Sequence, residues 1–568
     1  MRLRTDQKQD ILKYPNQTRT VDLSTRGDHS ASTGKVFLSG VMVLTLSTVL
    51  VKLIGLFYKI PMLHYLGTEG MGYFNAAYEW YATLCVLSTA GLPLAGSMLI
   101  AEARAANSGR AIRMIEQRML LLFFGLGTAG ALALFFGAGV IATLIGSPDT
   151  RYALMAVAPT LFFSCLSGAY RGYFQGYQDM LPTALSQIIE ALGKLLLGLG
   201  FAVFAWRQGL PAPLIAAWAM LGLGIGVGIS TLYLVLHRRK YQGESGNMDV
   251  PAMLKRPLRR LLSIAVPITV SSSVLSFTRL LDMAMILRRL QDIGYDTADA
   301  NALYGSYTTM AVPIFNLIPS LITSVALALV PALTAAIKAG DHTAQQATAR
   351  TAIRITALLS LPASLAVAIY SRTILSLLFR GETAAVEAAA PMLSLLAVSI
   401  FFSGLITTTN AILQAYGHVN APIFSMLIGS AVKLLGAYVL IGLPGLHIYG
   451  APISTFFCDA LIVGINMVLI ARYTNVMESL GRALLRPLVV SSVAVGVPGA
   501  VYALLCRVGY ADIPMFLIAV PVTVLLFIVL CLRTELIGDT ELAMLPHLNG
   551  KKVARMITML QGKRMIED

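Results

Sequence analysis

The sequence predicts an all-α polytopic membrane protein with about fourteen transmembrane helices, built as two duplicated six-helix lobes plus two C-terminal helices. Of its 568 residues, 56% are hydrophobic and 12% are charged, with a mean hydropathy of +0.73. A soluble protein of this length needs a much more polar surface. Apolar runs also recur at the length of about 20 residues that a helix needs to cross roughly 30 Å of hydrocarbon.

The fourteen apolar runs define the expected organisation of the chain. They centre near residues 47, 90, 131, 163, 195, 224, 274, 318, 364, 400, 432, 460, 496 and 523. The predicted segments are a cytoplasmic N-terminal tail (1–35), an N-lobe of six spans (36–237), a cytoplasmic connector (238–258), a C-lobe of six spans (259–472), two further spans (484–535) and a basic cytoplasmic tail (536–568). The polar opening stretch shows no cleavable signal, so we expect the first run to remain as an anchor.

The distribution of Lys and Arg predicts the orientation. With the N-terminus inside, loops and tails on the cytoplasmic side carry 31 of the 43 Lys and Arg residues, and those on the opposite side carry 8. Because positive loops stay in the cytoplasm, both termini are expected there. The net charge of +15 is therefore interpreted as a topological signal and not as a nucleic-acid surface.

Residues typical of catalysis or metal binding do not form recognisable patterns. The five cysteines fall in or beside apolar runs without CxxC spacing, and the seven histidines fall in predicted loops or tails. We therefore expect no metal, no cofactor and no enzymatic activity. In the tail, residues 550–564 alternate apolar and basic positions at helical spacing, which fits an interfacial helix on anionic lipid or a plain solvated helix.

An internal repeat relates the two predicted lobes at a shift of 239 residues. The segment FFSCLSGAYRGYFQGYQ from Phe162 resembles FFSGLITTTNAILQAYG from Phe401. One helix later, the shift aligns Lys194 with Lys433, each followed by two leucines. The shift contains an even number of spans, so the lobes share one orientation and are related by an axis along the membrane normal. In transporters built this way, the substrate site lies between the repeats near the midplane.

Cationic side chains within or beside these spans are the candidate substrate-binding residues. A charge at the centre of a membrane helix costs at least about 2.5–3.5 kcal/mol, so each needs a partner or a watery cavity. Lys52 lies in the first span with Lys59 two turns further on the same face, and Lys194 lies in the fifth span, Arg279 in the seventh and Lys433 in the eleventh. A cavity between the lobes that gathers these cations would suit an anionic headgroup.

Two of these cations have an acid within their own helix. Glu190 precedes Lys194 by four residues, and Asp282 follows Arg279 by three. Both spacings are typical of intrahelical ion pairs, so a purely structural role is the alternative.

Lys52 and Lys433 have no acid within a turn of their own helix, which makes them the sharper candidates. Their alternative is snorkelling, or pairing with Glu79 or Asp459 on another helix.

Two segments resemble a known family. KLIGLFYKIPMLHYLGTEGMGYFNAAYEWY (52–81) with LSTAGLPLAGSMLIAEARA (87–105), and YGSYTTMAVPIFNLIPSLITSVALALVPALTAA (304–336), are similar to the stage V sporulation protein B and MurJ-type flippases of Gram-positive bacteria. These belong to the polysaccharide biosynthesis family of the MATE-like MOP superfamily. In that resemblance, Lys52 takes the place of a first-span arginine, and Tyr58 and Lys59 take the place of a basic–acidic pair.

The resemblance implies a V-shaped fold that moves undecaprenyl-pyrophosphate-linked peptidoglycan precursor (lipid II) across the bacterial cytoplasmic membrane by alternating access. It implies a basic central cavity for the headgroup and a groove for the lipid tail along the last two spans. Expected partners are this lipid-linked anionic glycan, membrane lipids and cell-wall synthesis enzymes. Alternatives are another lipid-linked polysaccharide unit, or a cation-coupled exporter that would need unpaired intramembrane carboxylates, for which Glu79 and Asp459 qualify.

Overall fold

A computed structural model describes residues 26–241, 257–474, 477–509, 511–534 and 536, with side chains from Ser47 onward. The predicted interfacial helix at 550–564, most of the connector and the first 25 residues lie outside this part. Within the described residues, the regular structure is helical throughout. The all-α class is therefore confirmed.

The first half of the chain forms one group of helices. In order, they are α1 (Arg26–Thr89), α2 (Leu92–Ala105), α3 (Gly109–Leu144), α4 (Thr150–Gly176), α5 (Leu181–Gly193), the π-helical turn η1 (Lys194–Gly198), α6 (Leu199–Arg207), α7 (Ala212–Arg238) and the short η2 (Arg239–Tyr241).

The second half repeats this pattern and adds two helices. It contains α8 (Pro257–Asp292), α9 (Thr297–Ser306), the π-helical turn η4 (Tyr307–Ala311), α10 (Val312–Lys338), α11 (His342–Leu378), α12 (Thr383–Ala415), α13 (Asn420–Ile441), η5 (His447–Tyr449), α14 (Gly450–Tyr473), α15 (Met477–Arg507) and α16 (Asp512–Arg533).

Thirteen helical segments in the described residues are long and apolar enough to cross a membrane, and the first of them accounts for two crossings. It runs from Ser47 to Ala105, 59 residues, which would span about 88 Å as a straight helix. At Gly67 the backbone takes φ 67° and ψ 176°, a conformation almost restricted to glycine, and the helix folds back on itself. The chain therefore crosses fourteen times, as the apolar runs predict.

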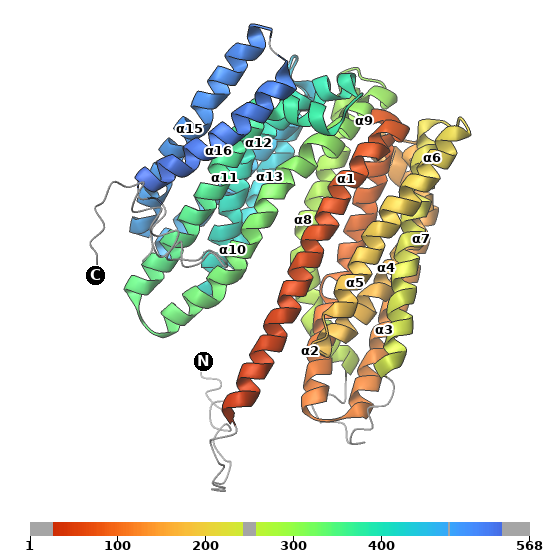
Figure 1. The fold of residues 1–568 in the computed structure, drawn as a ribbon. Helices are drawn as coiled ribbons and strands as arrows, with labels where there is room; N and C mark the ends of the chain where they lie inside the picture. Colours follow the sequence, from red (N-terminus) through yellow and green to blue (C-terminus); the bar gives the residue numbers. More distant parts are fainter. Residues whose placement is uncertain (1–25, 242–256, 475–476, 510, 535, 537–568) are drawn as a thin grey trace, which may run out of the picture.

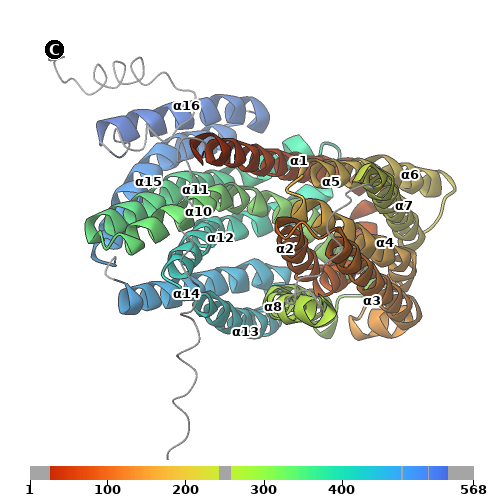
Figure 2. The ribbon, with the colours of Figure 1, turned by 90° about the horizontal axis from the view of Figure 1, so that it is seen from below.

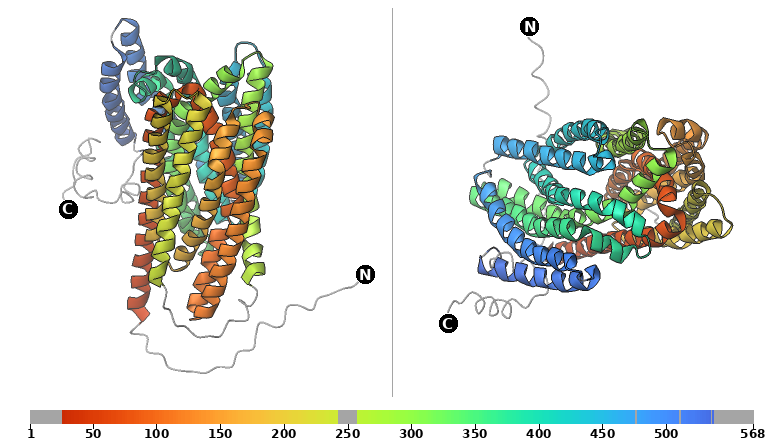
Figure 3. Two further views of the ribbon diagram at one scale, coloured as in Figure 1. Left: turned by 90° about the vertical axis from the view of Figure 1, so that its right-hand side faces the viewer. Right: turned by 90° about the horizontal axis from the view of Figure 1, so that it is seen from above.

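The helices form two bundles with an appended pair (Figure 1). In the N-lobe, α4 packs against α3 and α7, and α5 packs against α7; in the C-lobe, α12 packs against α10, α11 and α14. The appended α15 and α16 pack against each other and against α11, on the outer side of the C-lobe (Figure 3). The six-plus-six-plus-two arrangement follows from these contacts.

Two helices of the second half carry most of the contact with the first. α8 packs against α1, α2 and α3 on one side and against α13 on the other, and viewed from below it lies between the bundles (Figure 2). α9 and η4 pack against α1. This contact is so close that a Cβ built on Gly72 would overlap the carbonyl oxygen of Asn301, and one on Gly305 would overlap that of Thr68.

The halves lie close together at one end and diverge at the other. α9 lies beside the turn of α1, whereas its continuation α10 leads away from α1 toward the end at which α1 begins, and packs on α11 and α12 (Figure 1). The result is the V shape expected for this fold.

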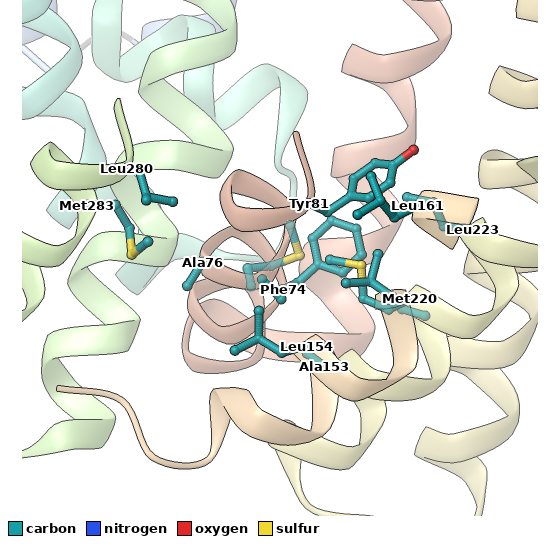
Figure 4. Packing of buried hydrophobic residues seen from close by; sticks show 14 of the residues in the cluster. Phe74, Ala76, Tyr81, Ala153, Leu154, Leu161, Met220, Leu223, Leu280 and Met283 are labelled. Atoms are coloured by element: carbon teal, nitrogen blue, oxygen red, sulfur yellow. The ribbon is translucent and has the colours of Figure 1, made fainter. Parts of the chain in front are cut away.

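The second arm of α1, after Gly67, is the centre of the apolar core. Phe74 and Tyr81 point toward Met220 and Leu161 of the N-lobe, while Ala76 faces α8, which carries Leu280 and Met283 (Figure 4). Side chains of both halves thus join one buried cluster, which holds α8 against the N-lobe.

Candidate functional site

A cavity of about 410 Å³ opens inside the N-lobe, and Lys52 lies on its wall. Helices α1, α4, α5 and α7 enclose this N-lobe cavity, whose polar lining is Thr48, Lys52, Tyr58, Tyr78, Tyr81, Arg171, Gln187, Glu190 and Lys194. The Lys52 side chain is exposed and has no hydrogen-bond or ion-pair partner among the described residues. It is therefore available to a ligand.

Lys194 lies against aromatic rings, with Glu190 in electrostatic range but with no direct ion pair among the described residues. Its Nζ is 4.3 Å from the ring centroid of Tyr78, 5.1 Å from that of Tyr58 and 5.9 Å from that of Phe74. Ring faces attract cations, which compensates part of the cost of burial. Lys194 also begins the π-helical turn η1, a distortion that is frequent at functional sites.

The expected pairing of Glu190 with Lys194 is replaced by a contact between helices. Arg171 of α4 places its Nη2 2.8 Å from Oε2 of Glu190, and its Nε donates to Oγ of Ser186 at 2.9 Å. The guanidinium satisfies two acceptors at once, which an ammonium on a flexible stem does less well. Glu190 is thereby neutralised from outside its own helix.

Lys433 forms a mostly buried ion pair with Asp282. Their Nζ and Oδ2 atoms are 2.7 Å apart, and the side chains are 16% and 11% exposed. Among the described residues, Asp282 forms no ion pair with Arg279, the alternative that the spacing left open. The Arg279 side chain is exposed and donates from Nη2 to Oγ of Ser276 at 3.3 Å. Lys433 reaches Asp282 because its helix, α13, packs directly on α8.

Glu79 connects these C-lobe charges with the N-lobe. It lies in electrostatic range of Arg279, Lys59, Asp282 and Lys433, and Asp459 lies in range of Lys433. Both halves of the chain thus contribute to one interlobe charge cluster, which consists of Lys59, Glu79, Arg279, Asp282, Lys433 and Asp459.

Three of the five candidate cations lie in the interlobe charge cluster and two line the N-lobe cavity, with Lys59 of the cluster in electrostatic range of Lys194. The interlobe charge cluster holds three basic and three acidic side chains, so its formal charges cancel. In the N-lobe cavity, Lys52, Lys194 and Arg171 face the single acid Glu190. The cationic excess is concentrated in the N-lobe, and that is where an anion is bound most favourably.

Uncharged polar side chains tie the halves together close to this cluster. Asn75 donates from Nδ2 to the hydroxyls of Thr308 at 3.0 Å and Thr309 at 2.8 Å. Lys59 donates to the Thr308 carbonyl at 2.7 Å. Sequence reasoning missed these residues because Asn and Thr carry no charge and are common in helices.

Sequence reasoning also missed Arg171, which was counted with a cytoplasmic segment. It lies inside α4 and lines the N-lobe cavity. One signal pointed to it: the 239-residue shift aligns Arg171 with Asn410, another polar residue inside an apolar run. Asn410 accepts a buried hydrogen bond from Asn466 at 2.8 Å.

The fold matches that of transporters with two related lobes. A structure described as lipid II flippase MurJ in an inward closed conformation superposes with a TM-score of 0.66 at 15% identity, covering 86% of this chain and 98% of that one. An inward-facing MATE multidrug resistance transporter of the MOP superfamily gives a TM-score of 0.60 at 14% identity, covering 75% and 99%. The chain therefore shares its fold with these two solved transporters.

The chain belongs to the polysaccharide biosynthesis protein family, whose model matches residues 37–337. The MatE model matches residues 306–439. Stage V sporulation protein B of Bacillus subtilis (strain 168) is 26% identical over 459 residues, which cover 78% of this chain and 84% of that protein. Lipid II flippase MurJ of the same organism is 24% identical over 455 residues, covering 76% and 82%. The protein is thus a member of the polysaccharide biosynthesis protein family with many helices long and apolar enough to cross a membrane.

Proposed function

We propose that this protein flips lipid II, an undecaprenyl-pyrophosphate-linked peptidoglycan precursor, across the cytoplasmic membrane. The observation that carries the proposal is the N-lobe cavity, in which Lys52 is unpaired among the described residues and Lys194 lies against aromatic rings without a direct ion pair among those residues. Two cations without an ion-paired acid favour an anionic headgroup, because the charge of a pyrophosphate is opposite to theirs.

The dimensions and chemistry of the cavity suit a phosphate with an attached sugar. Its volume of about 410 Å³ falls in the range of small-molecule pockets. Tyr58, Tyr78 and Tyr81 offer ring faces and hydroxyls, and Gln187 offers an amide. Lys52 and Lys194 would bind the charge, and the tyrosines and the amide would contact the sugar.

The interlobe charge cluster would assist the movement of the two halves more than it would bind the cargo. Its charges cancel in the present arrangement, and a rocking of the halves would separate Lys59 and Glu79 from Arg279, Asp282 and Lys433. The negative charge of an incoming pyrophosphate would then neutralise the cations that have lost their acidic partners. An inside-negative potential would favour outward movement by about 2.3 kcal/mol per negative charge per 100 mV.

This mechanism needs a defined orientation and defined partners. We propose that both termini are cytoplasmic, as the 31-to-8 distribution of Lys and Arg predicts, and that the membrane is of the Gram-positive type. The divergent end of the V then faces the cytoplasm, where the cargo enters. Membrane lipids and cell-wall synthesis enzymes are the further partners that we propose.

A cation-coupled exporter is the second candidate. Asp459 lies in a mostly buried position near Lys433, and Glu79 has no direct ion pair among the described residues, so both carboxylates could bind a proton or Na⁺. The match of the MatE model to residues 306–439 adds to this reading.

Two assays separate these functions. The gene should restore growth to a bacterium depleted of its own lipid II flippase, and the purified protein in proteoliposomes should expose fluorescent lipid II to an impermeant quencher. A matched proteoliposome sample with a different undecaprenyl-pyrophosphate glycan tests cargo specificity. Export of a cationic dye without lipid II movement would support the exporter instead.

A further inference from the structure

A second, larger cavity lies on the opposite face of α4, away from Lys52. It has a volume of about 640 Å³ and is bounded by the beginning of α3 and the ends of α4 and α7. Its charged and phenolic lining is Arg113, Glu116, Tyr170, Tyr173, Tyr177, Arg238, Arg239 and Tyr241. We name it the rear cavity. Tyr170 lines it, while the next residue, Arg171, lines the N-lobe cavity.

Arg238 is fixed in this wall with one donor unused. Its Nε and Nη2 bind both oxygens of Glu116 at 2.6 and 2.7 Å, and its Cζ lies 4.5 Å from the ring centroid of Tyr173. The third nitrogen, Nη1, is buried and has no hydrogen-bond partner among the described residues. A buried donor without an acceptor is costly, so this atom marks a place where an acceptor is missing.

The surrounding charge specifies the kind of acceptor. Arg238 already neutralises Glu116, which is the one acid among the described lining residues. Arg113 and Arg239 are exposed side chains that line the same cavity, and neither has an ion pair or hydrogen bond among the described residues. The first turn of α3, from Gly109, also borders the cavity and directs N–H groups to this end.

We propose that the rear cavity binds a phosphate-bearing anion, held by Arg113, Arg239 and Nη1 of Arg238. Arginine suits this role because its planar group donates to phosphate oxygens in pairs. Two sources share the chemistry: the headgroup of an anionic phospholipid, and free phosphate. Basic pockets between the ends of membrane helices typically bind anionic headgroups. The site is independent of the cargo proposed for the N-lobe cavity.

Thermal unfolding of the full chain tests the proposal. One arm adds inorganic phosphate in detergent at constant ionic strength; the other compares nanodiscs of phosphatidylglycerol with nanodiscs of phosphatidylcholine. In the wild type, the melting temperature should rise with phosphate, with phosphatidylglycerol, or with both, and the pattern identifies the source. The double variant Arg113→Gln/Arg239→Gln should weaken the apparent affinity by about tenfold or more.

The matched control is Arg110→Gln/Lys240→Gln. It removes the same charge from exposed positions next to the site that do not line the cavity, and it leaves the Arg238–Glu116 pair intact. It should respond like the wild type. An equal loss of response in both double variants, or no response of the wild type in either arm, would overturn the proposal. Both variants are first compared without ligand, so that a folding defect is recognised.

Discussion

Lys433 and Asp282 form an ion pair between α13 and α8, with 2.7 Å between Nζ and Oδ2. Its second carboxylate oxygen, Oδ1, is buried without a hydrogen-bond partner among the described residues. The pair therefore fixes α8, which otherwise packs on the N-lobe, to the C-lobe. It joins two helices of the second half, one of which also packs on helices of the first half.

Removing one partner of this link should destabilise the protein strongly. Asp282→Asn leaves the Lys433 ammonium buried without its counter-charge, at a cost of about 3–5 kcal/mol. We expect a clear drop in melting temperature for Asp282→Asn and for Lys433→Gln. The double variant Asp282→Leu/Lys433→Met should recover much of the lost stability, because two apolar side chains leave no buried charge that needs a partner. A double variant as unstable as the single ones would contradict this account.

Lys52 should matter for transport and not for stability. Its side chain is exposed and unpaired among the described residues, so Lys52→Gln removes no internal contact. The loss of one charge-assisted contact of about 1.5–3 kcal/mol should slow lipid II movement roughly 10- to 100-fold. Lys52→Arg, which keeps the charge, is the control. Transport and melting temperature are measured on the same preparations, and an unchanged rate in Lys52→Gln would remove this residue from the site.

The aromatic contacts of Lys194 should depend on ring faces and not on hydroxyls. Tyr78 is the ring nearest to Nζ, at 4.3 Å from its centroid. Tyr78→Phe keeps the ring and should unfold like the wild type, whereas Tyr78→Leu should lose about 0.5–2 kcal/mol of unfolding free energy. Denaturant titration measures both. Equal destabilisation would show that the hydroxyl group dominates.

The close contact at Gly305 should control the separation of the halves. A Cβ there would overlap the carbonyl of Thr68, so Gly305→Ala should push α9 away from α1. Spin labels at exposed Asp149 and Asp296, in a cysteine-free background, should report a longer distance. Gly125→Ala is the control, since its Cβ would meet no atom within 4 Å. An unchanged distance in Gly305→Ala would mean that the contact adapts without moving the helices.

The fold could be predicted because membrane crossing depends on local composition. Each apolar run specifies its own helix, and the charge distribution needs no tertiary information. The partners could not be predicted in the same way. Lys433 pairs with a residue on a helix far away in sequence, and spacing rules describe only neighbours on one helix.

Arg171 shows why the site was harder to predict than the spans. Hydropathy places an arginine outside the membrane, because its charge is costly there. Glu190 and Ser186 offset that cost by approaching from α5, which only the packing of α4 and α5 around one cavity reveals. The free-energy cost of a charge inside the membrane is what makes Arg171 look like a loop residue in the sequence. The same cost explains why Glu190 and Ser186 bind its guanidinium in the fold.

The backbone reversal at Gly67 bears on how the chain is inserted during synthesis. A single residue with φ 67° separates the first two crossings, so few polar side chains have to be carried through the bilayer at this step. Both arms can enter the lipid together as a helical hairpin. A bulkier residue at this position would have to adopt a strained conformation before any of the later helices exists to support it.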